Sequence, residues 1–358
     1  MGKVTLSVLA LIAGLIAYLL FWPVPIRPEV WDAPPDPGFT GEFEANQRLA
    51  DLRFIDLPEG EYGPEDVALG PDGRIYMALH SGRIAALTLE TETFETITDT
   101  GGRPLGIEFD GEGTLWIADA YIGLLAMSPD GDLTTIATET SDGSPILYAD
   151  DLDIAADGKV YFSDASTRFG AKEIGDTLAA SILDLMEHSD NARVLVYDPA
   201  DGTTTTLVEG LTFANGIAQS ADERFLMIAE TGGYFIHRFD LETGAIEPFV
   251  GPLPGFPDNV NDNPDGTFWS GLASPRNTTM DDASDRPFVR KIAMRVPFMA
   301  PAPERYGAVF RFDAYGTVLE TLQDPTGAYA STTGAITLPD GRIVVSSLTE
   351  PRIGILTP

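Results

Sequence analysis

The stretch that decides the fold is Ala214-Asn215-Gly216, which stands just ahead of an apolar run that begins at Ile217. Comparable segments recur ahead of other apolar runs punctuated by Gly and Asp: Pro64-Glu65-Asp66-Val67, Pro104-Leu105-Gly106-Ile107, Asp150-Asp151-Leu152, Pro257-Asp258-Asn259-Val260 and Thr333-Gly334-Ala335-Ile336. Four of the six segments carry carboxylate or amide side chains at matching places. We interpret them as a ring of ligands around one hard metal ion.

The rest of residues 41–358 shares the same repeated pattern. Short alternating or apolar runs are separated by turns such as Asp72-Gly73, Asp157-Gly158 and Asp340-Gly341, which is typical of β-strands. Six units of three or four strands, with a period of roughly 40–75 residues, predict an all-β, six-bladed β-propeller. The last unit, 332–358, has only three strands, so we expect residues 43–55 to supply its outer strand and close the ring.

The amino-terminal region predicts a membrane anchor. Residues 4–22 carry no charge, and a helix of that length spans roughly 28 Å, about one hydrocarbon core. We therefore expect residues 1–22 to form a single transmembrane helix. Lys3 precedes the apolar run and favours a cytoplasmic amino terminus, with the propeller on the periplasmic or extracytoplasmic side. A cleaved signal peptide is the alternative. Residues 23–40 are rich in proline and predict an extended stalk.

Composition excludes several classes of function. The chain has 358 residues and a net charge of −33, with 55 acidic against 22 basic residues, so nucleic acid is an unfavourable partner. It contains no cysteine, which excludes disulfides, a thiol nucleophile and a thiolate metal site. The sequence does not predict an oligomeric state.

Two insertions interrupt the repeat period, at 167–191 and 275–306. In the first, Leu178, Ile182, Leu185 and Met186 recur at helical spacing and predict a helix. Both insertions leave the sheet on loops. They either cover blade edges only or roof a pocket on the propeller face.

Several motifs together identify a family resemblance. The runs 188–199 (HSDNARVLVYDP), 210–218 (GLTFANGIA), 253–260 (LPGFPDNV) and 161–166 (YFSDAS) resemble the strictosidine synthase-like family. This resemblance covers about residues 45–356. It implies a six-bladed propeller related to paraoxonases, adipocyte plasma membrane-associated protein and SMP-30/gluconolactonases, most of which are calcium-dependent esterases or lactonases.

The resemblance implies two groups of metal ligands. A central calcium ion would be held by Glu65, Asp150, Asn215, Asp258 and Asn259. A deeper structural calcium would use Asp66, Asp151 and the carbonyl of Ile107.

The sequence also departs from the related enzymes. The synthase needs a Glu near the inner strand of the last blade, but no acid lies between Asp324 and Asp340, so we expect no strictosidine-forming activity. Paraoxonases use a His pair above the calcium. Leu105 stands at the first of those positions, and His80, His188 and His237 are expected to lie elsewhere.

The residue types independently favour the same ion. Ca²⁺ prefers carboxylate and amide oxygens, with Mg²⁺ as a possible substitute, whereas Zn²⁺ would require His or Cys. Our first hypothesis is a calcium-dependent hydrolase of esters or lactones, with Asp258 or Asp150 as the general base. The expected substrate contacts are Tyr121, Phe169, Phe213, Tyr234 and Arg276.

Our second hypothesis is a membrane-tethered binding module in which calcium is purely structural. For a single pair such as Asn215-Gly216, an ordinary turn is a further alternative to a metal ligand.

Overall fold

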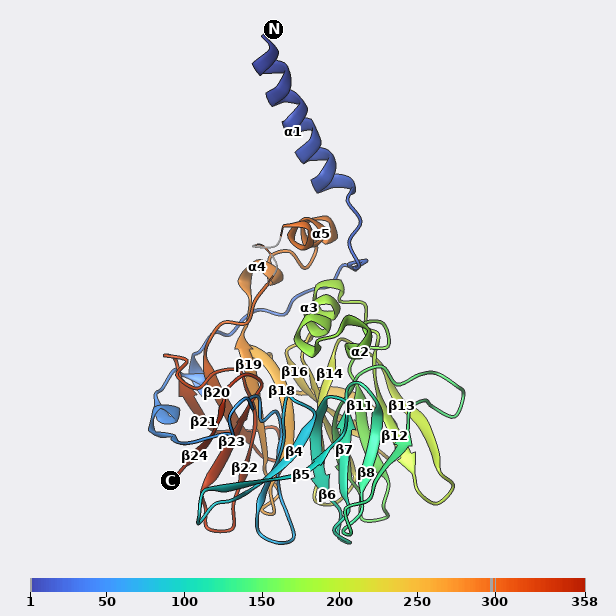
Figure 1. The fold of residues 1–358 in the computed structure, drawn as a ribbon, viewed down its shortest axis with the longest axis vertical. Coiled ribbons are helices and arrows are strands. Elements are labelled where there is room, and N and C mark those ends of the chain that lie inside the picture. The colour runs from blue at the N-terminus through green and yellow to red at the C-terminus, as the bar shows by residue number, and fades with distance from the viewer. Residues whose placement is uncertain (1, 297–298, 300, 358) are drawn as a thin grey trace.

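The computed structural model describes residues 2–296, 299 and 301–357. Its strands form six four-stranded antiparallel sheets, arranged as the blades of a propeller (Figure 1). The predicted six-bladed all-β propeller is therefore confirmed. An apolar helix, α1 (Lys3–Phe21), precedes it and is long enough to span a membrane.

Five blades use consecutive strands, with the innermost strand first. The first blade consists of β2 (Val67–Leu69), β3 (Ile75–Ala78), β4 (Arg83–Thr88) and β5 (Thr93–Asp99). The second consists of β6 (Pro104–Phe109), β7 (Leu115–Asp119), β8 (Gly123–Met127) and β9 (Leu133–Ala137). The third consists of β10 (Ala149–Ile154), β11 (Val160–Asp164), β12 (Ala192–Asp198) and β13 (Thr203–Leu211). The fourth blade consists of β14 (Ala214–Gln219), β15 (Phe225–Glu230), β16 (Phe235–Asp240) and β17 (Ile246–Val250). The fifth consists of β18 (Gly255–Asp262), β19 (Phe268–Pro275), β20 (Gly307–Phe312) and β21 (Val318–Asp324).

The sixth blade closes the ring with strands from both ends of the chain. It contains β22 (Thr332–Thr337), β23 (Ile343–Ser347) and β24 (Arg352–Leu356), and β1 (Arg53–Asp56) pairs antiparallel with β24. Residues 43–55 were expected to form this outer strand. Only their end does so, because η1 (Gly41–Phe43) and η2 (Arg48–Asp51) turn the preceding chain against β21.

Packing between neighbouring blades makes the core. The second strands of the blades are almost fully buried, as in β7 and β11, whereas the outer strand β5 is mostly exposed. Six clusters of buried residues each combine two adjacent blades: Ala68 and Tyr76 of the first blade, for example, pack against Ile107 and Ile117 of the second. Since a single blade cannot bury both its faces, the apolar strands dictate radial stacking.

The two insertions form helices on one face of the propeller (Figure 1). The first contains α2 (Ala171–Ile174) and α3 (Thr177–Glu187), which includes the predicted helical stretch. Asp176 caps α3 by accepting a hydrogen bond from the backbone N–H of Ala179. The second insertion contains α4 (Thr278–Asp281) and α5 (Pro287–Arg295).

The proline-rich segment 23–40 is extended, as expected, but it packs against these helices. Ile26 is buried, and the Trp31 ring stacks on His188 with 3.8 Å between ring centroids. The backbone N–H of Glu29 donates to the carbonyl of Glu187, and Arg276 donates to the carbonyl of Pro34. The segment is thus fixed across the insertions and is not a free stalk.

Candidate metal centre

The predicted ligands lie at irregularities in the innermost strands. The pairing register shifts between Ala149 and Leu152 in β10 and between Ala214 and Ile217 in β14. Strand β18 shifts between Pro257 and Val260. Because a β-bulge places an extra residue opposite the partner strand, consecutive side chains can turn away from the sheet. Here those residues are the predicted pairs 150–151, 215–216 and 258–259.

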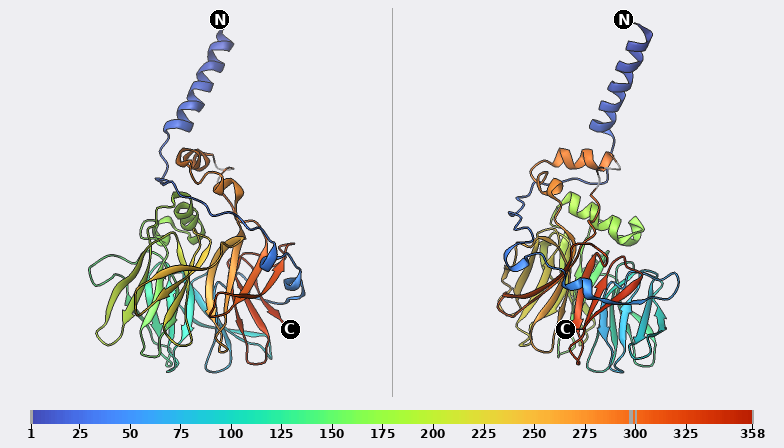
Figure 2. Two further views of the ribbon diagram at one scale, coloured as in Figure 1. Left: turned by 180° about the vertical axis from the view of Figure 1, so that it is seen from behind. Right: turned by 90° about the vertical axis from the view of Figure 1, so that its left-hand side faces the viewer.

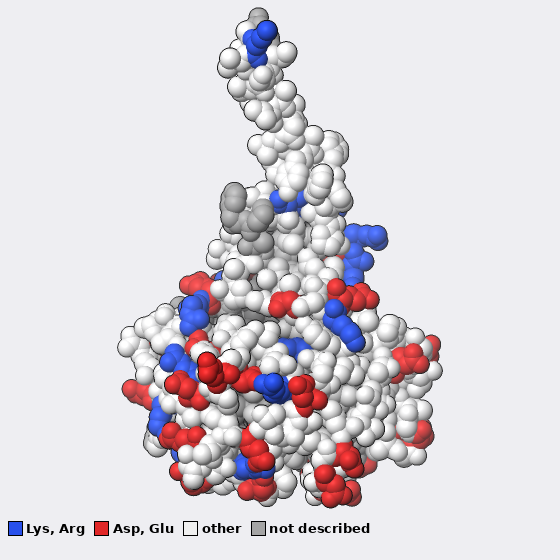
Figure 3. All heavy atoms as spheres, in the orientation of Figure 1, with Lys and Arg blue, Asp and Glu red and all other residues white. Residues whose placement is uncertain are grey.

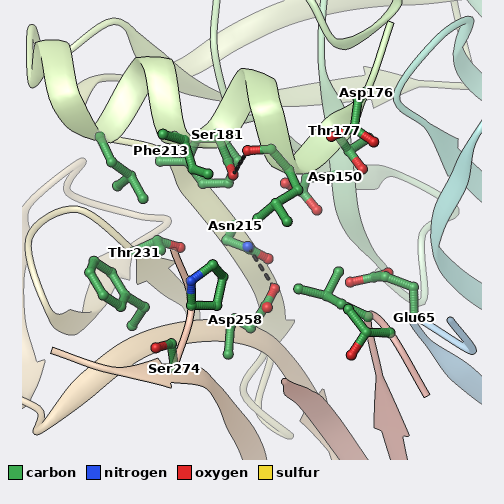
Figure 4. Close-up of a pocket in the computed structure, with 18 of the residues that line it drawn as sticks. Glu65, Asp150, Asp176, Thr177, Ser181, Phe213, Asn215, Thr231, Asp258 and Ser274 are labelled. Atoms are coloured by element: carbon green, nitrogen blue, oxygen red, sulfur yellow. Dashed lines mark hydrogen bonds between the residues drawn. The ribbon is translucent and has the colours of Figure 1, made fainter. Parts of the chain in front are cut away.

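These three bulges, together with the segment ahead of β2 that carries Glu65, bring side chains from four blades to one cavity. This cavity has a volume of about 270 Å³, and Glu65, Asp150, Asn215 and Asp258 line it beneath helix α3 (Figure 4). The Asn215 amide nitrogen donates to Asp258 Oδ1 at 2.7 Å. Asn259, behind them, donates its amide nitrogen to the Glu65 backbone carbonyl at 3.1 Å and to Glu65 Oε1 at 3.3 Å.

These residues leave oxygen atoms without partners. All five are at least 96% buried. Within the described part of the chain, Glu65 Oε2, Asn215 Oδ1 and Asn259 Oδ1 are buried and accept no hydrogen bond. A buried polar atom without a partner costs about 1–3 kcal/mol. The oxygen-only donor set and its unsatisfied acceptors therefore fit a hard cation.

The arrangement is not a ready-made cluster of acids. No group of three His, Cys, Asp or Glu side chains among the described residues is close enough to hold a metal. Two of the five predicted ligands are amides, and both direct their nitrogen toward carboxylate oxygens. Because half a turn of an amide exchanges its nitrogen and oxygen, cation binding would require these two side chains to rotate.

Burial raises the pKa values of the three carboxyl groups in this cavity, and for Glu65 and Asp150 the neighbouring acids raise them further. Burial, followed by the charges of Asp258 and Asp150, raises the pKa of Glu65 well above its ordinary value. Burial and the charge of Asp258 do the same to the pKa of Asp150. Burial raises the pKa of Asp258 to about 7. A cation among these groups would remove the penalty for ionising them.

Two residues that sequence reasoning missed also line the cavity. Arg103 is 2% exposed, and its Nε and Nη2 have no partner among the described residues. His80 was expected to lie elsewhere, but its ring stacks on Tyr62 at the cavity wall. Burial and the charge of Arg103 lower the pKa of His80, so this imidazole is neutral at pH 7. Arg103 precedes an inner strand, and that position was the only signal in the sequence.

Only one of the five predicted substrate contacts lines this cavity, namely Phe213. Tyr121 and Phe169 belong to the hydrophobic cluster under the insertions. Tyr234 is fully buried and donates its hydroxyl to Asp281 at 2.8 Å. Arg276 forms an ion pair with Asp281 and lies over the Tyr234 ring. These four side chains therefore lie outside this cavity, among the residues of the insertions and of segment 23–40, and their contact with a substrate stays a prediction.

The residues predicted for a second metal lie deeper along the axis. Asp66 accepts hydrogen bonds from the backbone N–H of Ile107 at 2.9 Å and from Asn261 at 3.0 Å. Asp151 accepts from the backbone N–H of Ile217 at 2.9 Å. Both acids thus join the inner strands of different blades. Asp66, Ile107 and Asp151 line a smaller cavity, which also contains Glu108, Asp153 and Asp262.

Comparisons with known proteins agree with this architecture. Residues 41–87 match the family model described as strictosidine synthase-like, N-terminal, and residues 150–242 match the model described as strictosidine synthase. The chain is 34% identical to protein strictosidine synthase-like 13 of Arabidopsis thaliana, over 78% of this chain and 77% of the relative. It is 29% identical to the adipocyte plasma membrane-associated protein of Salmo salar, over 98% and 90% of the two chains.

Solved structures share the fold at low sequence identity. A gluconolactonase from Xanthomonas campestris superposes with a TM-score of 0.61 and 19% identity. The match covers 93% of this chain and 98% of the other.

Proposed function

The chain belongs to the strictosidine synthase-like family, and on this premise we propose that it is a metal-dependent hydrolase of carboxylic esters or lactones. One observation carries the proposal. Carboxylate and amide side chains from four blades, some of whose buried oxygens have no hydrogen-bond partner among the described residues, meet in one largely apolar cavity. Such a cavity binds a small apolar molecule and presents its reactive group to the polar end.

The five residues Glu65, Asp150, Asn215, Asp258 and Asn259 would hold Ca²⁺, with Mg²⁺ as the possible substitute. The bound ion would polarise the substrate carbonyl and stabilise the developing oxyanion. Arg103 supports that role, because its Nε and Nη2, which have no partner in the described part of the chain, are additional donors beside the same acids. We propose Asp66, Ile107 and Asp151 as the surroundings of a second, structural ion.

Three residues are candidates for accepting the proton of the attacking water. The pKa of Asp258, about 7, suits a general base at neutral pH. Asp150 has a strongly raised pKa for the same reasons. Metal ligation would weaken both as bases, whereas the neutral imidazole of His80 lies on the wall of the same cavity. We therefore add His80 to the two acids.

The last blade gives no support for strictosidine formation. Thr333 stands in the stretch where the synthase has its Glu, and it donates its hydroxyl to the Glu65 carbonyl. Its hydroxyl also lies 2.6 Å from that of Ser346. We propose that this threonine fixes the backbone of the first ligand and takes no part in proton transfer.

The test is hydrolysis of phenyl acetate and a panel of lactones by the full-length chain in detergent, with and without a calcium chelator. We expect chelation to abolish hydrolysis and added Ca²⁺ to restore it. Equal or negligible rates on every substrate under both conditions would refute the proposal.

A binding propeller with a structural ion is the second candidate. It is favoured by the hydrogen bonds through which Asp66 and Asp151 already join blades. Asn215→Ala separates the two candidates. Loss of hydrolysis with an unchanged melting temperature indicates a catalytic ion, whereas loss of stability with intact hydrolysis indicates a structural one.

A further inference from the structure

Helix α5 lies crosswise below the end of α1, between that helix and the propeller (Figure 2). Arg295, at the end of α5, donates hydrogen bonds to the carbonyl groups of Leu19 and Trp22 at 3.0 and 2.6 Å. In return, the Tyr18 hydroxyl donates to the Arg295 carbonyl at 2.7 Å. The last turn of α1 is therefore fixed to α5.

Two apolar residues of α5 are exposed. Phe288 and Val289 are 48% and 37% exposed. Phe288, Ile292 and Arg295 follow one another by four and three residues, so they share the side of the helix that contacts α1. The opposite side packs inward through Ala293 and Met294. An exposed Phe on a helix that adjoins a membrane-spanning helix points to the bilayer surface.

The charge distribution fits the same surface. Figure 3 shows a mainly uncharged neck below α1, with basic groups beside it and acidic groups spread over the propeller body. Arg286 and Lys291 belong to this part of the chain, at the start and on the flank of α5. A strongly acidic protein that approached anionic lipids elsewhere would be repelled, so this neck is the favourable side.

The large cavity reaches this face, where its lining includes residues of both insertions. Its outer wall is formed by Leu178, Ile182 and Leu185 of α3, together with Pro301 and Pro303 after α5. Leu178 is 38% exposed. A molecule that moves past these side chains to Glu65, Asp150 and Asp258 contacts mainly apolar groups, and Asp176 at the start of α3 also lines the cavity.

We propose that α1 and α5 hold the cavity mouth at the bilayer surface, and that the substrates are lipophilic esters or lactones that enter from the membrane. This substrate class rests on the hydrolase function proposed above, whereas the contact of α5 with lipid does not. The acyl chain of such a substrate lies along α3 and its carbonyl group reaches Glu65, Asp150 and Asp258.

The lipid contact is tested with the full-length chain in vesicles of phosphatidylcholine and phosphatidylglycerol. Because the chain has no cysteine, Phe288→Cys provides a single site for a fluorescent probe. Tyr315→Cys, on a residue that is 87% exposed in a turn of the fifth blade, is the matched control. We expect brominated lipids to quench the probe at 288 and not at 315. Equal quenching at both positions, or none at 288, would overturn the proposal.

The substrate class is tested with Phe288→Glu and the control Leu319→Glu, which places the same charge on an exposed apolar residue of β21. For a long-chain ester in vesicles we expect kcat/KM of Phe288→Glu to fall about tenfold, with hydrolysis of soluble phenyl acetate unchanged. Equal rates for long-chain and short-chain esters in the unmodified protein would overturn the substrate class. Absence of all hydrolysis would refute the hydrolase function, while the quenching result would still decide the lipid contact.

Discussion

Arg103 places one permanent positive charge beside the buried carboxyl groups of the candidate metal centre. Its charge lowers the pKa of Glu65 and of Asp150, although burial raises both by more. Arg103→Met removes the attraction between this positive charge and the two carboxylates, so we expect a lower melting temperature of the metal-free protein. It also removes repulsion of a bound cation, so we expect Ca²⁺ to bind about tenfold more tightly, equivalent to about 1.4 kcal/mol. Calorimetric titration and thermal melts check both outcomes.

The conservative control for this prediction is Arg103→Lys, which keeps the charge and should keep the affinity for Ca²⁺ near that of the parent. If both substitutions weaken Ca²⁺ binding alike, the guanidinium geometry and not its charge governs the site. That outcome would contradict an electrostatic role for Arg103.

The raised pKa values make the stability of the metal-free protein depend on pH. Burial raises the pKa of Asp258 to about 7 and that of Asp66 to about 6. Such groups bind protons more tightly in the folded than in the unfolded protein. Their stabilisation is complete below the unfolded pKa of about 4 and is lost as pH rises through 7. We expect the melting temperature without divalent ions to fall between about pH 5 and pH 8.

Calcium should reverse this trend, because it binds the ionised carboxylates. The increase in melting temperature on adding Ca²⁺ should therefore be larger at pH 8 than at pH 5, as scanning fluorimetry can measure. Asp258→Asn removes one of the titrating groups and should reduce the slope in metal-free buffer. An unchanged slope in that variant would assign the pH dependence to the acidic surface and not to this site.

At the level of elements, the inner strands alternate around the axis. At the start of each inner strand stands a pair of residues, and its second member is an acid or amide in three blades, namely Asp66, Asp151 and Asn259. It is a glycine in the three blades between them: Gly106, Gly216 and Gly334. A Cβ on Gly106 would lie 2.6 Å from the Asp151 Cα, and one on Gly216 would lie 2.3 Å from the Val260 nitrogen. The glycines thus let adjacent inner strands approach closely.

This alternation predicts the effect of Gly216→Ala. Its backbone conformation is ordinary, but the added methyl group would meet main-chain atoms that cannot rotate away. We expect a loss of about 1–3 kcal/mol in the free energy of unfolding, measured by denaturant titration. We also expect weaker Ca²⁺ binding, because Asp258 and Asn259 carry the displaced backbone.

Gly111→Ala is the matched control, since a Cβ at that exposed turn would contact nothing within 4 Å. Its free energy of unfolding should stay close to that of the parent. Equal destabilisation by both substitutions would show that loss of backbone freedom, and not the approach of neighbouring strands, explains the role of Gly216.

These elements also show what the sequence could predict. Turn chemistry and strand alternation are local, so the six repeats could be recognised directly. Because Glu65, Asp150, Asn215 and Asp258 stand at matching positions of different repeats, the sequence also predicted that they would line one cavity. In contrast, the approach of Arg103 and His80 depends on how neighbouring blades pack. The burial of Tyr234 and Arg276 depends on how the insertions fold back, and neither arrangement has a local signature.

At the scale of the whole molecule, closure of the ring depends on a short amino-terminal segment. Strand β1 pairs four residues with β24, and Leu49, Leu52 and Ile55 are buried by at least 94%. Burial of each side chain contributes about 2 kcal/mol, so their combined contribution is comparable with the total stability of many domains, about 5–15 kcal/mol. The pairing of β1 with β24 should therefore limit the stability of the entire propeller.

The prediction compares a chain that begins at residue 57 with one that begins at residue 41. Both lack α1 and the segment that packs on the insertions, so they differ only in η1, η2, β1 and the short connections around them. We expect the chain from 41 to be soluble with one cooperative thermal transition. The chain from 57 leaves the edge of β24 unpaired, and we expect aggregation or a melting temperature lower by more than about 10 °C. Equal melting temperatures would show that the ring stays closed without the pairing of β1 with β24.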